Sequence, residues 1–118
     1  KANYNLLILI KRDEKSYDLV ARAWVSFNRE SNILSAAQTT TFVKGAGYMQ
    51  RAITLLILTD AIKKWSSSMV MTDLAEKMYA RMAEDNRLRV SSEEETVQDL
   101  WHRYWPFGNY YLVEKTIK

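Results

Sequence analysis

The stretch TTTFVKGAGYMQRA, residues Thr39–Ala52, joins a run of β-branched and aromatic residues to a helix-like segment. Threonine, phenylalanine and valine favour strands, and Gly45 and Gly47 interrupt that run. Apolar residues then become dense between Met49 and Trp65, which predicts a helix buried on nearly all sides. The stretch therefore predicts a strand that turns directly into a helix, as at the start of an α/β or α+β domain.

The residues before this turn predict one strand and one helix. Tyr4–Ile10 (YNLLILI) is apolar almost throughout, which is typical of a strand buried on both faces. An amphipathic helix is expected over roughly Glu14–Phe27, with a second strand within Ile33–Lys44. The apolar face of that helix would be formed by Leu19, Val20, Ala23, Trp24 and Phe27. The first 65 residues are thus expected to run strand–helix–strand–helix.

The second half of the chain predicts mainly helices. Thr72 is suited to cap a helix that runs to about Asp85. Alternation at Arg87–Val90 predicts a short strand. An S-x-x-E capping pattern then begins at Ser91, and apolar residues follow at helical spacing, so another helix is expected. A last strand is predicted at Tyr110–Ile117. Two helices followed by a strand could alternatively make Thr72–Lys118 a winged-helix-like unit with DNA as its ligand.

Composition favours one globular domain and excludes several kinds of chemistry. The chain has 118 residues, of which 47% are hydrophobic and 26% charged. With no cysteine and one histidine, disulfides and thiolate metal sites are excluded, and neither a metal nor another cofactor is expected. No apolar run approaches the ~20 residues of a membrane span, so no membrane partner is expected. The net charge of +3 fits either ordinary solubility or an anionic partner.

The glycine turn lacks the signatures of a nucleotide site. A dinucleotide fingerprint needs a third glycine where this chain has Gln50, and no GK[ST] precedes the helix. Two interpretations remain: a plain turn in which glycine supplies a positive φ, or a turn that lets a polyanion backbone approach. Basic and aromatic residues flank the turn, as a sugar–phosphate backbone would require. They are Lys44, Tyr48 and Arg51.

Two motifs carry a resemblance to a known family. A basic pair, Lys11-Arg12, directly follows the first strand in LILIKR, and FVKGAG at Phe42–Gly47 leads into a helix with Arg51 in its first turns. This order resembles the Alba superfamily of nucleic-acid-binding proteins, which includes Alba-like subunits of eukaryotic RNase P and MRP. The resemblance implies one Alba-like domain over residues 1–118, of class α/β (α+β). Its βαβα core would span residues 4–65 and 110–118, with a helical insertion at residues 66–108 and a C-terminal strand.

The resemblance also implies a function and a site. It points to a non-catalytic RNA-binding protein, with DNA as the other possible ligand, acting as a subunit of a larger ribonucleoprotein such as a ribosome, a mitoribosome or an RNase P-like complex. The expected nucleic-acid-binding residues are Lys11, Arg12, Lys44, Gly45, Gly47, Tyr48 and Arg51. Expected partners are RNA and the protein subunits of that complex, including an Alba-like homodimer or heterodimer. The compartment stays open, and an intracellular location such as the mitochondrion would fit.

An alternative is a protein-interaction or assembly subunit that does not touch nucleic acid. It would use the helical insertion and an aromatic, basic surface near the C-terminus. That surface would consist of Arg103, Trp105, Phe107 and Tyr110. An enzyme is the least supported class, because His102 has no recognisable catalytic partner in the sequence.

Overall fold

The computed structural model describes residues 2–68, 72–98 and 100–117, and within them the chain is a mixed α+β protein. Its strands form one six-stranded sheet in the order β1-β2-β3-β4-β6-β5. Neighbouring strands are antiparallel except β3 and β4, which are parallel and connected through α1. The elements are β1 (Ala2–Lys11), β2 (Tyr17–Asn28), β3 (Ile33–Thr41), α1 (Tyr48–Leu58), β4 (Lys64–Ser66), α2 (Asp73–Ala83), β5 (Leu88–Gln98) and β6 (Tyr104–Lys115).

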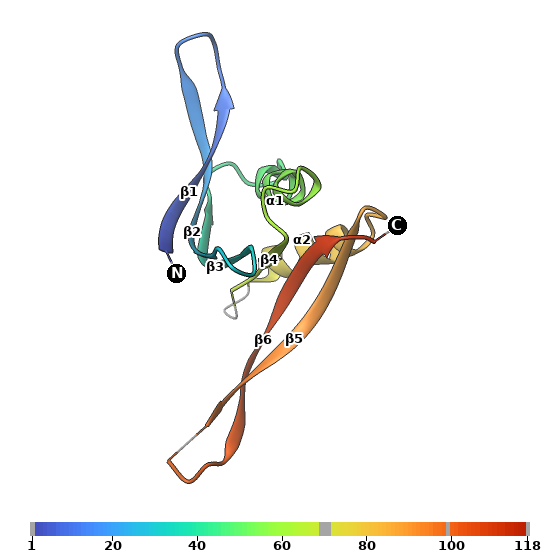
Figure 1. Ribbon diagram of the computed structural model, residues 1–118. Helices are drawn as coiled ribbons and strands as arrows, with labels where there is room; N and C mark the ends of the chain where they lie inside the picture. Colours follow the sequence, from blue (N-terminus) through green and yellow to red (C-terminus); the bar gives the residue numbers. More distant parts are fainter. Residues whose placement is uncertain (1, 69–71, 99, 118) are drawn as a thin grey trace.

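Two long hairpins project from opposite ends of this sheet (Figure 1). Strand β3 ends at Thr41, which pairs with Ala21, so the part of the β1–β2 hairpin beyond Ala21 has no third strand. Strand β4 pairs with β6 over three residues, so most of the β5–β6 hairpin extends past it as well. The molecule is consequently elongated, with a longest dimension of 59 Å.

Both helices pack on the same face of the sheet and bury one hydrophobic core there. Helix α1 contributes Met49, Ile53 and Ile57, and α2 contributes Tyr79 and Met82. The facing positions of β2 include small residues, which lets the helical layer approach the sheet closely. The other face of the sheet carries no helix in the described part of the chain, and on β1–β3 it stays open to solvent.

The helix expected over Glu14–Phe27 is wrong, because this segment is strand β2. Alanines and valine alternate into the core at Ala21, Ala23 and Val25, while Trp24 points to the open face. A bulge next to Val20 breaks the alternation, and with Trp24 counted as a core residue the pattern imitates a helical face. The first 66 residues therefore run β-β-β-α-β rather than in the expected strand–helix–strand–helix order.

Other predictions for the chain are partly confirmed. The strands at the N-terminus, before Gly45 and at the C-terminus are present, and so is helix α2. The N-terminal strand is not buried on both faces as expected, because β1 lies at the edge of the sheet and Leu7 and Leu9 are exposed on its open face. Thr72 caps α2 through its side-chain oxygen, which accepts a hydrogen bond from the Ala75 N–H at 3.1 Å. The helix expected to reach Trp65 ends at Leu58, because the chain turns there and continues as β4.

The expectation that residues 66–108 form a helical insertion is wrong for its second part. The segment from Ser91 continues β5, and Pro106 and Gly108 lie within β6 rather than at a helix end and a turn. Strand β5 pairs with β6 over its whole length, and this ladder provides the backbone hydrogen bonds that a helix would have supplied. The local capping pattern at Ser91 is therefore overridden by a long-range pairing.

Candidate nucleic-acid interface

The glycine turn between β3 and α1 is held in place by its own side chains. Gly45 and Gly47 have φ values of 81° and 71°, and a Cβ on either would meet no atom within 4 Å. The backbone conformation, and not crowding, therefore requires glycine here. The Arg51 guanidinium donates to the Ala46 carbonyl at 3.0 Å and lies 4.8 Å from the centre of the Tyr48 ring. Arg51 and Tyr48 thus contact each other, and Arg51 also binds the backbone of the turn.

Replacing Gly47 with alanine is expected to destabilise the fold by about 1–2 kcal/mol, the cost of a left-handed conformation for a residue with a Cβ. Gly47→Asn should cost less, because asparagine tolerates this conformation better. Urea unfolding followed by circular dichroism measures both variants. An alanine variant as stable as the wild type would show that the positive φ is not needed at the start of α1.

The structure separates the basic pair from the glycine turn. Lys11 is the last residue of β1, and Arg12 lies in the turn at the end of the projecting hairpin. The Arg12 guanidinium forms an ion pair with Asp18, which leaves Lys11 as the unpaired charge of the two within the described residues. Lys44 and the glycines lie near the base of the hairpin, where β3 ends, so the predicted residues form two places rather than one site (Figure 1).

The predicted partner-binding residues lie on β6 and on the turn before it. Arg103 is exposed in that turn, and Tyr110 is half-buried on β6 opposite Glu93 of β5. The backbone of β6 includes Trp105 and Phe107, but their side chains lie outside what the structure describes. The predicted partner-binding surface therefore lies on strand β6 of the long β5–β6 hairpin and not on a helix.

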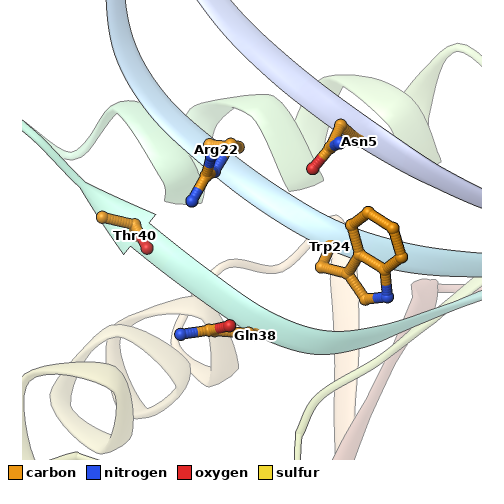
Figure 2. A pocket seen from close by; sticks show the side chains of 5 residues that line it. All are labelled: Asn5, Arg22, Trp24, Gln38 and Thr40. Carbon is orange, nitrogen blue, oxygen red and sulfur yellow. The ribbon is translucent and has the colours of Figure 1, made fainter.

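A hollow that sequence reasoning missed lies on the open face of β1, β2 and β3. Figure 2 shows its five lining side chains in front of the sheet, with the helices behind. The hollow has a volume of about 180 Å³ and is lined by Asn5, Arg22, Trp24, Gln38 and Thr40. Cross-strand pairing places them side by side: Trp24 is opposite both Asn5 and Gln38, and Arg22 is opposite Thr40.

The five side chains of this hollow are available for a ligand. Among the residues that the structure describes, no hydrogen bond or ion pair joins any of them to another side chain or to the backbone through its polar atoms. Trp24 is 46% exposed although its strand lies between β1 and β3. An indole, a guanidinium, two amides and a hydroxyl supply a stacking surface, a phosphate-binding group and hydrogen-bonding groups in one place.

The open face of the β1–β2 hairpin, which carries the hollow, is basic. Strand alternation places Lys11 and Arg22 on the open face of the β1–β2 hairpin, and no acidic residue of the described strands β1 to β3 shares that face. Asp18, opposite Ile10, alternates to the other face of the hairpin and forms an ion pair with Arg12. An anion approaching the open face of these strands therefore meets two cations and no carboxylate.

The sequence contains a signal for this hollow in RAWVS, residues 22–26. Read with a period of two, it places Arg22, Trp24 and Ser26 on one face and Ala23 and Val25 on the other. A large aromatic residue between polar neighbours on the outer face of a strand indicates an exposed ring. The helical interpretation of the same residues assigned Trp24 to the core and so concealed the signal.

Other kinds of site receive no support from the described residues. None of the helices that the structure describes is long and apolar enough to cross a membrane. Within residues 2–68, 72–98 and 100–117, no three histidine, cysteine or acidic side chains come together as metal ligands would. Comparisons with protein-family models, with curated proteins and with solved structures found no match for the chain.

Proposed function

We propose that this protein is a non-catalytic RNA-binding protein that holds a single strand on the open face of its sheet. The single observation that carries the proposal is the exposed indole of Trp24 set beside Arg22 and two amides, all without partners in the described part of the chain. Trp24 would stack on a base, Arg22 would contact a phosphate, and Asn5 and Gln38 would bind base edges. DNA is the alternative ligand.

The geometry favours a single strand over a duplex. In a duplex the faces of the bases are stacked on each other, so an aromatic ring on a sheet cannot reach them. The open face of β1–β3 presents the Trp24 ring and side-chain amides on a strand surface, where unstacked bases can lie. Thr40, opposite Arg22, offers a hydroxyl to the sugar or phosphate.

We further propose that the protein works as one subunit of a larger ribonucleoprotein, such as a ribosome, a mitoribosome or an RNase P-like complex. Two cations on the open face of the β1–β2 hairpin would give a modest affinity, which suits a subunit held in place by additional contacts. A relationship to the Alba superfamily is part of this proposal, supported by the motifs at Lys11-Arg12 and Phe42–Gly47. The proposed binding surface itself depends on β2, where the resemblance implied a helix.

The substitution Arg22→Gln tests the electrostatic part of the proposal. We expect weaker binding of a single-stranded RNA, and a slope of log K against log salt that is shallower by about 0.7, the value for one phosphate contact on a single strand. Fluorescence anisotropy at several salt concentrations measures both. Double-stranded RNA should bind more weakly than the single strand, and single-stranded DNA of the same sequence shows whether the 2′-hydroxyl contributes.

Arg89→Gln is the matched control for this experiment. Arg89 is an exposed arginine on β5, about 19 Å or four strand spacings from β2. Its substitution removes the same charge and should leave the salt slope unchanged. Equal losses in both variants would mean that only net charge matters, and this result would contradict a site at Arg22.

The alternative of a protein-interaction subunit is favoured by the β5–β6 hairpin. Between Ser91 and Tyr111 the sequence has four acidic residues and one arginine, and the described Leu100 and Trp101 near its turn are highly exposed. An acidic, aromatic arm repels a polyanion and suits a protein partner. If the wild type binds no RNA at low salt, the protein-interaction function replaces the RNA-binding function. If the wild type binds RNA, the β5–β6 hairpin remains available for the other protein subunits of the complex.

A further inference from the structure

The projecting end of the β1–β2 hairpin repeats the chemistry of the Trp24 hollow. Lys11 is the cross-strand neighbour of Tyr17, which is 57% exposed. Leu9 is paired with Leu19, and both are exposed. Along the hairpin they lie between the Lys11–Tyr17 pair and Arg22. An aromatic ring beside a cation thus occurs twice on the open face of one hairpin, with apolar side chains between the two places.

Residues 11–18 carry balanced charges: Lys11, Arg12 and Lys15 are basic, and Asp13, Glu14 and Asp18 are acidic. Lys11 has no ion pair among the described residues, whereas the Asp18 carboxylate is neutralised by Arg12. The Asp13 carboxylate is held by the turn itself, because it accepts hydrogen bonds from the backbone N–H groups of Lys15 and Ser16 at 2.8 and 3.0 Å. Of the charges on the paired strands, strand alternation places Lys11 on the open face and Asp18 on the other, so the Lys11 ammonium is available to a ligand that lies along the open face.

The spacing of the two places matches a short single strand. Trp24 is opposite Asn5 and Tyr17 is opposite Lys11, so they are six residues apart along β1, or about 20 Å. That length corresponds to a few extended nucleotides. A two-stranded ribbon is strongly twisted, and a flexible single strand can follow this twist where a rigid duplex cannot.

We infer that Tyr17 and Lys11 form a second stacking and phosphate-binding subsite, so that a single-stranded RNA of several nucleotides runs along the hairpin from Trp24 to its end. We call this surface the hairpin strip: Trp24, Arg22, Leu9, Leu19, Tyr17 and Lys11. The inference rests on the proposed function, since Trp24 and Arg22 provide the first subsite. It adds a minimum ligand length and assigns a role to the part of the hairpin that projects beyond β3.

Binding of uridylate oligomers of increasing length to the full chain tests the hairpin strip. We expect the affinity of the wild type to rise steeply between two and six nucleotides, as the RNA reaches the second subsite, and to level off beyond that. Tyr17→Ser should lower the affinity for the six-nucleotide RNA by at least about 5-fold, the lower end of the range for one stacked base. It should leave the affinity for the dinucleotide unchanged, and Tyr17→Phe should retain the wild-type length dependence.

Tyr4→Ser is the matched control, because Tyr4 is 47% exposed on the same hairpin but alternates to the face that carries the helices. It should change neither affinity. If Tyr17→Ser binds every length like the wild type while Trp24→Thr weakens all of them, the second subsite is wrong and the proposed function stands. If Trp24→Thr also has no effect, the proposed function fails with it. Equal losses from Tyr4→Ser and Tyr17→Ser would overturn the strip as well, because a loss of hairpin structure would then explain both.

Discussion

Replacing Trp65 with alanine is expected to lower the free energy of unfolding by about 3–5 kcal/mol, a large part of the stability of a domain of this size. Trp65 is fully buried on β4, the short strand that joins the two halves of the sheet. Its indole N–H donates to the hydroxyl of Tyr79 on α2 at 2.9 Å, and the Tyr79 ring stacks on Tyr111 at 5.0 Å. The substitution would open a cavity and also leave that hydroxyl unpaired.

Trp65→Phe and Tyr79→Phe separate these two contributions. Each keeps most of the buried volume and removes one partner of the hydrogen bond, so each should cost about 1–3 kcal/mol. Burial raises the pKa of Tyr79 to about 12, more than the Trp65 hydrogen bond lowers it. Because the unfolded tyrosine ionises near its usual pKa of 10.0, the stability from this group should be lost as the pH rises from 10 towards 12. Urea unfolding measures all three variants; a Trp65→Ala variant within 1 kcal/mol of the wild type would contradict this account of the core.

Replacing Trp24 with threonine is expected to weaken single-stranded RNA binding by roughly 5- to 150-fold, which corresponds to about 1–3 kcal/mol for one stacked base. Threonine favours strands, and Trp24 lies on the open face, so the fold should be retained. Trp24→Phe keeps an aromatic ring and should retain most of the affinity. Anisotropy titrations measure the affinities, and circular dichroism confirms that each variant is folded.

Trp101→Thr provides the control for the loss of an exposed tryptophan. Trp101 is more exposed than Trp24 but lies at the turn of the β5–β6 hairpin, at the other end of the molecule (Figure 1). Its substitution should leave RNA affinity unchanged. If instead Trp101→Thr weakens binding and Trp24→Thr does not, the RNA lies on the acidic arm and the open face is not the binding surface.

The parts of the fold that the sequence predicted correctly are those defined by local chemistry. The strand before Gly45, the glycine turn and the capped helix α2 each follow from a few adjacent residues with a specific backbone preference. The two largest failures, β2 and the part of the β5–β6 hairpin between Ser91 and Tyr110, depend on partners far along the chain. Strand β2 contains a bulge at Val20 and an outward tryptophan, and β5 is defined by its pairing with β6 rather than by the capping pattern at Ser91.

For the same reason, the sequence predicted only one of the residues that the candidate site on the open face contains. Lys11 was predicted because the family resemblance implies a basic pair at the end of the first strand, and it shares the open face of the hairpin with Arg22. Arg22 and Trp24 were missed because their segment was expected to be helical, which turned an exposed ring into a core residue. Gln38 and Thr40 join them through the β2–β3 register, and no local pattern in the sequence determines that register.

The most direct test of the central claim is a nuclear magnetic resonance titration of the isotope-labelled protein with a single-stranded RNA, following backbone amides and tryptophan indole N–H groups. The account predicts that the Trp24 indole and the amides of Asn5, Arg22 and Gln38 shift on binding. The Trp65 indole, buried and bonded to Tyr79, should not move. Shifts confined to the β5–β6 hairpin, or none at all at millimolar RNA, would contradict it.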